Sequence, residues 1–198
     1  MSHDHSHGHG HDHDHEHTHN HSHGHQVPWD VADEKWFVPG WNDPIVRTIF
    51  HAAELNTIDV VVDADCLDIN PLSAAAGWAH GPLTGIVPAS VADAIRAALS
   101  GHPNAERFRI QSHAPPAGEA SIVWSIGAAS KWSEPAARIA AMHAMLRPGG
   151  QIFVADDGLD ARALRGLLRE QGFRGVQARN YTLEGVRFVL LMGRRAAG

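Results

Sequence analysis

The sequence predicts a three-layer α/β fold, in which helices cover both faces of a largely parallel β-sheet. The segment from Ile122 to Asp156 reads as strand, loop, helix, turn and strand. Two strands joined by a covering helix within about thirty residues form a right-handed crossover, so they run parallel in one sheet. The apolar, β-branched run Ile58–Val62 predicts a further buried strand. The pair Phe173–Tyr181 and Val186–Met192 predicts a C-terminal hairpin.

Residues 1–26 form a low-complexity tail with histidine at every odd position from 3 to 25. We expect this tail to be disordered, because nothing between its histidines is apolar and it has no core to join. Neighbouring imidazoles chelate Ni²⁺, Zn²⁺, Co²⁺ and Cu²⁺, so the tail is a predicted site for these ions. The alternative is a solubilising tail that binds metal only when metal is abundant. The predicted ligands are His3, His5, His7, His9, His11, His13, His15, His17, His19, His21, His23 and His25.

The whole chain has 198 residues, enough for one domain with its own core in addition to the tail. Without the four acids of the tail, 16 basic and 18 acidic residues remain, a balance that predicts no nucleic-acid partner. The single cysteine, Cys66, excludes an internal disulfide, and no apolar run is long enough to span a membrane. We therefore expect a cytoplasmic protein with no membrane partner.

Residues 27–42 form an aromatic arm between the tail and the body. Its rings either cap a substrate cleft or pack the arm onto the body. A helix is expected from Pro44 to Leu55 with Asp43 as its N-cap, and it leads into the strand Ile58–Val62. The aromatic residues of the arm are Trp29, Trp36, Phe37 and Trp41.

Regular elements continue through the rest of the body. Leu83–Val87 and Arg107–Gln111 are predicted strands, and a helix over Val91–Leu99 separates them. Leu159–Gln171 repeats leucines on one helical face and leads into the C-terminal hairpin. The candidate caps of that last helix are Asp157 and Asp160.

The crossover has clear start and stop signals. Its first strand is Ile122–Ile126, and Ser133 is the expected N-cap of the helix, with Pro135 just inside. Arg147-Pro148-Gly149-Gly150 should end the helix, because proline cannot continue it and glycine supplies left-handed backbone. The strand Ile152–Ala155 follows.

The end of this crossover resembles a known family. Leu146-Arg147-Pro148-Gly149-Gly150 and the strand after it look like the helix-to-strand turn of class I S-adenosylmethionine (SAM) dependent methyltransferases. Residues 124–135, WSIGAASKWSEP, are similar to the small-molecule, type 11-like branch of that family. The resemblance spans about Asp43 to Arg195. It implies a methyltransferase-like domain over residues 43–198, with a Rossmann-like, seven-stranded, mostly parallel sheet and an antiparallel last strand.

The resemblance also places the cofactor loop after the strand that ends at Asp63, the position of the family's strand-ending acid. Asp65, Leu67 and Ile69 then stand where the family has glycines, and Cys66 stands where it often has cysteine. Glycine lets the backbone approach a cofactor closely, whereas these side chains would crowd the methionine part of SAM. We therefore predict a degenerate cofactor loop.

Two further family positions differ in this chain. Val87 replaces the acid that binds both ribose hydroxyls, and it cannot accept a hydrogen bond. Ser112 or His113 stands where the family usually has an acid near the adenine amine. SAM binding is therefore predicted to be weak or lost. The predicted cofactor-contacting residues are Asp63, Ala64, Asp65, Cys66, Val87, Pro88, Ser112, His113, Ser125, Ile126 and Gly127.

No catalytic residue is evident from the sequence. Residues 125–128, SIGA, replace the Asn/Asp-Pro-Pro-aromatic motif of related enzymes, so methylation of a planar amine is disfavoured. His113 is the weak candidate for a catalytic base, since strand ends line the ligand crevice of an open α/β sheet. His143 is expected to be structural. An alternative metal site in the body would use Asp63, Asp65, Cys66, Asp68 and His113.

Two hypotheses about function follow. The chain is either a SAM-dependent methyltransferase-like protein that acts on a small molecule of unknown identity, or a non-catalytic pseudoenzyme. In the second case the inherited fold serves as an interaction or metal-binding protein through the histidine-rich tail.

Overall fold

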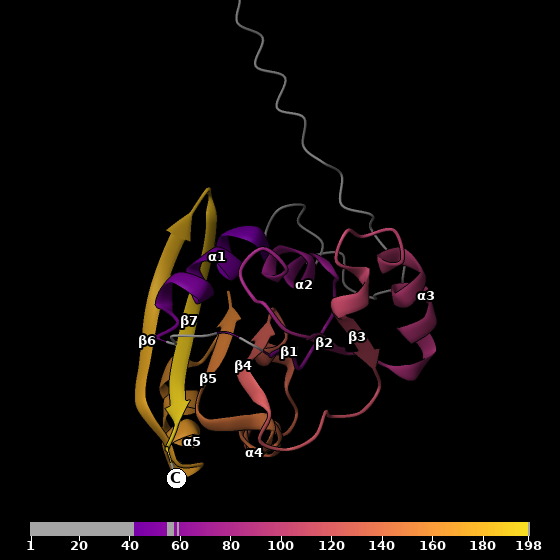
Figure 1. Cartoon of the computed structure of the whole chain (residues 1–198). Helices are drawn as coiled ribbons and strands as arrows, with labels where there is room; N and C mark the ends of the chain where they lie inside the picture. The colour runs from indigo at the N-terminus through magenta and orange to yellow at the C-terminus, as the bar shows by residue number, and fades with distance from the viewer. Residues whose placement is uncertain (1–41, 55–57, 59, 198) are drawn as a thin grey trace, which may run out of the picture.

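The computed structural model describes residues 42–54, 58 and 60–197. Its seven-stranded sheet has the order β3-β2-β1-β4-β5-β7-β6 (Figure 1). The first five strands in this order, from β3 to β5, run parallel to one another. Strand β7 is antiparallel to both of its neighbours, β5 and β6. The strands are β1 (Val61–Asp63), β2 (Leu83–Ile86), β3 (Phe108–Gln111), β4 (Ala120–Ile126), β5 (Leu146–Asp156), β6 (Phe173–Leu183) and β7 (Val186–Arg195).

Helices cover both faces of the sheet, which confirms the predicted three-layer α/β architecture (Figure 1). On one face, Ile49, Leu72 and Ile95 pack into a core with the sheet. On the other, Ile139 and Leu168 do the same. The first face carries α1 (Asn42–Ala52), α2 (Asn70–Ala75) and α3 (Ala89–Leu99), and the second carries α4 (Pro135–Met145) and α5 (Ala161–Glu170).

The strands β1, β4 and β5 are neighbours in the middle of the sheet. β4 pairs with β1 on one side and with β5 on the other, with Val123 opposite Val62 and Ile152. All seven residues of β4 are buried, as the apolar run in the sequence predicts for a strand covered on both faces. The last strand in the sequence, β7, is antiparallel to its neighbours, which confirms the expected direction of that strand.

Several predicted boundaries are wrong by a few residues. The first strand starts at Val61 rather than Ile58, and α1 begins at Asn42, one residue before the expected N-cap position 43. Glu134, not Ser133, precedes α4. Asp160 caps α5 as expected, because its side chain accepts from the backbone N–H groups of residues 162 and 163.

The Pro-Gly-Gly segment lies inside β5 instead of forming a separate turn before it. The pairing of β5 with β4 jumps from Leu146 opposite Ala120 to Gln151 opposite Ile122, and the extra residues form a bulge. Gly149 has a φ of +76°. A Cβ on Gly150 would lie 2.9 Å from the carbonyl oxygen of Ala120, so only glycine fits there.

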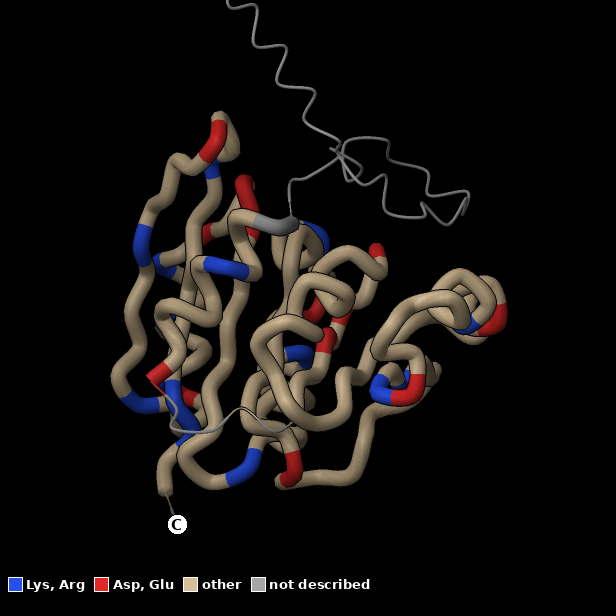
Figure 2. The backbone as a smooth tube through the Cα atoms, turned by 45° about the horizontal axis from the view of Figure 1, so that its top comes forward, with Lys and Arg blue, Asp and Glu red and all other residues tan. Residues whose placement is uncertain are grey.

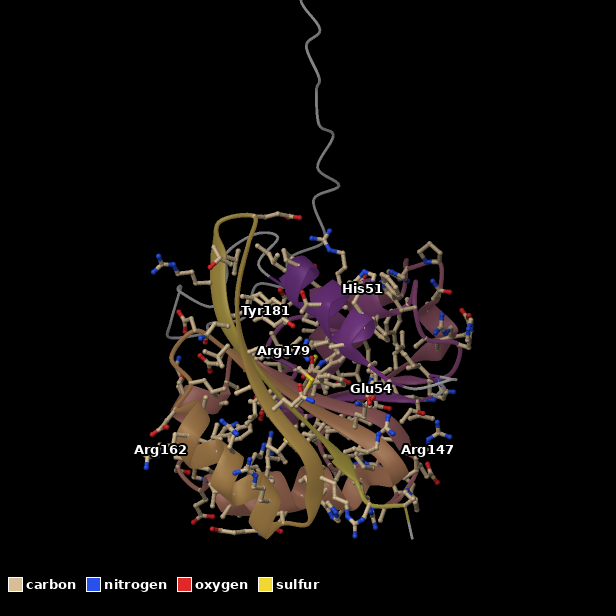
Figure 3. The ribbon with its side chains drawn as sticks, turned by 90° about the vertical axis from the view of Figure 1, so that its left-hand side faces the viewer. His51, Glu54, Arg147, Arg162, Arg179 and Tyr181 are labelled. Atoms are coloured by element: carbon tan, nitrogen blue, oxygen red, sulfur yellow. The ribbon has the colours of Figure 1, made fainter. Side chains whose placement is uncertain are left out.

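No pattern in the sequence predicts α2, because a helix of six residues is too short to show a helical period. Strand β6 forms one edge of the sheet, and Arg179 and Tyr181 lie along it (Figure 3). The Tyr181 ring stacks on Phe188 of β7 with centroids 5.2 Å apart. Neither basic nor acidic residues are confined to one side of the described chain (Figure 2).

The histidine-rich tail and the aromatic arm up to Trp41 lie outside the described residues, so the predictions for them stay predictions. Within the described part of the chain, no helix is both long and apolar enough to cross a bilayer.

Gly85 in β2 provides a test of core packing. A Cβ at this position would lie 2.9 Å from Leu72 Cδ1, 3.0 Å from Cys66 Sγ and 3.1 Å from Ile110 Cδ1. Because a packed core resists added volume, Gly85→Ala should lower the free energy of unfolding by about 1–3 kcal/mol in urea titrations.

Gly166→Ala is the matched control, since a Cβ on this α5 residue would meet nothing within 4 Å. It should raise stability by up to about 1 kcal/mol, the helix-propensity difference between glycine and alanine. Equal effects of the two substitutions would contradict the packing around Gly85.

Candidate functional site

The loop after β1 is fastened to the carboxyl ends of both neighbouring strands. The backbone N–H of Ala64 donates to the carbonyl of Trp124 in β4 at 2.8 Å, and that of Cys66 donates to Ile86 in β2 at 3.2 Å. This edge of a parallel sheet is where open α/β folds bind their ligands. Here the loop itself bridges the two strand ends.

The side chain of Asp65 accepts hydrogen bonds from three different elements. Its Oδ2 accepts from Ser125 Oγ of β4 at 2.5 Å and from Trp132 Nε1 at 3.0 Å. Its Oδ1 forms an ion pair with Arg138 of α4, which also donates to the carbonyl of Ala64. The Asp65 side chain is only 12% exposed and that of Arg138 is 36% exposed. At the position where the resemblance places the family's first glycine, the chain therefore has a charged, almost enclosed cluster formed by Asp65, Ser125, Trp132 and Arg138.

Asp156, at the end of β5, holds the segment that carries Trp132. It is completely buried, and its carboxylate accepts from the N–H of Ser130 at 2.9 Å and from the N–H of Gly158 at 3.0 Å. Ser130 belongs to the short 3-10 turn η3 (Ala129–Lys131), which immediately precedes Trp132. The position of the indole is thus set by the sheet edge and not only by Asp65.

Asp63 lies at the end of β1 in a very different environment. Its side chain is buried at 2% exposure, and this desolvation raises its pKa from 3.8 to about 8, with the Asp65 and Asp68 charges adding to the rise. The N–H of Asp65 donates to Oδ1 at 3.2 Å and lowers the pKa. The nearby Trp124 indole also lowers it, although its buried Nε1 makes no hydrogen bond of normal geometry within the described residues. Asp63 is therefore mostly neutral at pH 7.

The side chain of Cys66 is buried. Burial, with the Asp63 and Asp68 charges next in weight, raises the pKa of its thiol well above the usual value, and Sγ lies 3.4 Å from the carbonyl oxygen of Asp68. No group of three or more His, Cys, Asp or Glu side chains in the described residues is arranged to hold a metal ion. The alternative metal site in the body, with Asp63, Asp65, Cys66, Asp68 and His113, is therefore not supported.

The expected adenosine side of the site has a different character. Val87 is buried at 3% exposure, and its backbone N–H donates to the carbonyl of Gln111 at 2.9 Å. Pro88, Ser112 and His113 are exposed. His113 follows β3, two strands away from β1, a distance of roughly 10 Å at normal strand spacing. The structure does not bring His113 to the Asp65 cluster.

The resemblance identified Asp65 and Ser125, two of the four residues of the Asp65 cluster. The structure places Asp63, Ala64, Asp65, Cys66 and Ser125 together, with Ile126 and Gly127 directly following, and their contact with a cofactor stays a prediction. Trp132 and Arg138 were missed as partners of Asp65. The one available signal was the position of Trp132 in the WSIGAASKWSEP segment. His143, expected to be structural, packs edge-on against Phe173 with ring centroids 4.9 Å apart.

The raised pKa of Asp63 predicts an unusual pH dependence of stability. The folded protein keeps the proton of Asp63 up to about pH 8, whereas the unfolded chain loses it near pH 3.8. The free energy of unfolding should therefore decline as the pH rises from about 4 to about 8. Asp63→Asn should flatten this decline and stabilise the protein at pH 8 by on the order of 2 kcal/mol or more.

Urea titrations of both proteins across this pH range measure the effect. The same substitution at exposed Asp157 is the control and should leave the slope unchanged. An equal slope in wild type and Asp63→Asn would show that Asp63 is not the buried, neutral acid described above.

No protein-family model matches the chain, and no curated relative matches it either. Several solved structures match its fold. The 4+2 cyclase SpnF superposes with a TM-score of 0.68 at 16% identity, over 79% of this chain and 82% of that one. Geranyl diphosphate methyltransferase, in complex with GPP and sinefungin, gives a TM-score of 0.65 at 12% identity, over 77% of this chain and 78% of that one.

Human N-acetylserotonin methyltransferase in complex with SAM also matches, with a TM-score of 0.59 at 16% identity, over 76% of this chain and 51% of that one. Identities this low establish the fold and not the activity. The chain has the fold of the class I SAM-dependent methyltransferases.

Proposed function

We propose that the protein is a methyltransferase-like protein of the class I fold in which SAM binding is weak or lost. The observation that carries this proposal is the Asp65 cluster. At the place where the fold family keeps glycine, this carboxylate is held by Ser125, Trp132 and Arg138. A cofactor that needs this space would have to displace an ion pair.

Displacing Asp65 would be costly. The carboxylate is nearly enclosed, so removing it from Arg138 would leave two uncompensated charges in a partly desolvated place. The loop is also fastened through the backbone of Ala64 and Cys66. Leu67 and Ile69 add side chains at the next two glycine positions. Each of these features opposes the close backbone approach that the methionine part of SAM would need.

The ribose side adds a second loss. A diol held by a carboxylate gains hydrogen bonds to a charged group, worth roughly 1.5–3 kcal/mol. Buried Val87 cannot supply them. Since 1.4 kcal/mol corresponds to about a factor of ten, this change alone should weaken SAM binding by about one to two powers of ten.

The fold leaves the reaction open, because function depends on the site and not on the scaffold. One solved structure with this fold is named as a cyclase and others as methyltransferases. For this chain we propose a small molecule as the ligand of an active form, with exposed His113 as a weak candidate base. The non-catalytic pseudoenzyme is the alternative, and the eroded cofactor loop favours it.

Calorimetry with SAM and S-adenosylhomocysteine tests the proposal. The wild-type protein should bind SAM no better than roughly the high micromolar range, taking micromolar as an ordinary enzyme affinity. Asp65→Gly with Leu67→Gly should improve binding, because the substitutions remove the side chains that crowd the loop. Adding Val87→Asp should improve it further if the bound ribose satisfies the new carboxylate.

Asp157→Gly, in the exposed turn after β5, is the control for a loss of charge and of a side chain near the same sheet edge. It should leave SAM affinity unchanged. Low micromolar binding by the wild-type protein would overturn the proposal and favour an active SAM-dependent enzyme.

We propose metal binding by residues 1–26 as a second function, on the strength of the twelve alternating histidines. Ni²⁺, Zn²⁺, Co²⁺ and Cu²⁺ are the expected ions. Deleting residues 1–26 should abolish the binding of several Ni²⁺ or Zn²⁺ ions in calorimetry and leave the melting temperature nearly unchanged. Binding to the full chain should fade below about pH 6, since protonated imidazole has no lone pair to donate.

The truncated chain is its own control for the body histidines, because it retains His51, His80, His102, His113 and His143. Unchanged metal stoichiometry after truncation would place the ligands in the body and refute the role of the tail.

A further inference from the structure

We propose that Ser125, Trp132 and Arg138 form a carboxylate-binding site, which Asp65 occupies as an internal ligand. Small molecules with a free carboxylate are the external ligands that would compete with Asp65 for it. This inference rests on the proposed function, because it assigns a ligand class to the loop that closes the family's cofactor position.

The three donors match the chemistry of a carboxylate. A hydroxyl and an indole N–H reach one oxygen of Asp65, at 2.5 and 3.0 Å, and a guanidinium pairs with the other. Hydrogen bonds to an ionised acceptor are stronger than neutral ones. The planar guanidinium also suits carboxylates better than an ammonium group does. The site therefore selects a negatively charged, two-oxygen ligand.

The donors are positioned independently of their occupant. Ser125 lies in the fully buried strand β4, and Arg138 lies in α4. Trp132 follows the η3 turn, which buried Asp156 holds through Ser130. These elements would keep the donors converging if the Asp65 side chain were removed. An arrangement that is fixed before the ligand arrives loses little entropy on binding.

Asp65 belongs to the less regular part of the site. It lies in the loop between β1 and α2, while each donor side chain comes from or directly follows a regular element. The Arg138 side chain is 36% exposed, so the cluster has a solvent-facing side. A small anion can reach the guanidinium from that side once the Asp65 carboxylate no longer fills the site.

Asp65 should compete with simple anions for the native site. Asp65 is tethered beside its donors, and such intramolecular ligands act at effective concentrations of about millimolar or more. Removing its carboxylate leaves the buried Ser125 hydroxyl and the partly buried Trp132 indole without their acceptor and Arg138 without its counter-ion, an unfavourable state that an added carboxylate can relieve. Acetate should therefore stabilise an Asp65→Ala protein while leaving the wild-type protein unaffected.

Thermal unfolding in sodium acetate, compared with sodium chloride at equal ionic strength, tests this on the full chain. Asp65→Ala should melt below wild type in chloride. If acetate binds with a dissociation constant of about 10 mM, adding about 100 mM should raise the melting temperature of the variant by roughly 3–5 °C. The wild-type protein should shift by less than about 1 °C.

Three further variants isolate the site. Asp65→Ala combined with Arg138→Ala should lose the acetate effect, because the charged donor is gone. Asp65→Asn should show none, since its amide still fills the space. Asp93→Ala is the matched control, because it removes an exposed aspartate that pairs with Arg96 far from this cluster in sequence. It should behave like wild type.

Equal melting of Asp65→Ala in acetate and chloride would overturn the proposal, as would an equal acetate effect in the double variant. If Asp65→Ala is unfolded in chloride, circular dichroism replaces the melting curve. Acetate should then restore folded protein, and failure to do so would refute the site. SAM calorimetry on the wild-type protein is a separate measurement. Tight SAM binding would refute the proposed function, and it would not change the melting temperatures expected in acetate and chloride.

Discussion

The complete burial of β4 is the constraint on which the rest of the structure depends. The strand is paired on both edges and covered on both faces, so every one of its seven residues is buried. A polar group on such a strand needs an internal partner, because water cannot reach it. Ser125 meets this need by donating to Asp65. The packing of the central strand thereby favours an acceptor in the loop after β1, where the fold family has glycine.

Asp63 and Asp65 show how one loop can hold two acids in opposite states. Asp63 is desolvated and mostly neutral, with a pKa raised to about 8. Asp65 is paired with Arg138 and receives two further hydrogen bonds. The negative charge of Asp65 is one of the causes that raise the pKa of Asp63, so a neutral Asp63 is compatible with the ion pair between Asp65 and Arg138. The Asp65 carboxylate thus has its partners without a bound ligand, and this closed loop is the physical reason for the weak cofactor binding proposed above.

The amount that could be predicted differed between the fold and the site. Continuous β-branched runs were sufficient to predict β1, β4 and β5 as buried strands, because burial on both faces leaves a local signature. The crossover signals also predicted that β4 and β5 run parallel in one sheet. Boundaries were less certain, as the early start of β5 and the unexpected α2 illustrate. Of the site, resemblance identified Asp65 and Ser125. It could not identify Trp132 and Arg138, whose direction depends on how η3 and α4 lie over the sheet.

The sequence by itself determined the layered α/β fold and the absence of glycine from residues 57–75, since both are readable from neighbouring residues. Only the tertiary structure decided which side chains contact Asp65 in this loop. The donors to Asp65 lie 60, 67 and 73 residues further along the chain, and no local pattern links such distant positions. The neutral state of Asp63 likewise arises from complete burial at a sheet edge. A protonation state and an ion pair are properties of the assembled surroundings, so they exist only once the chain has folded.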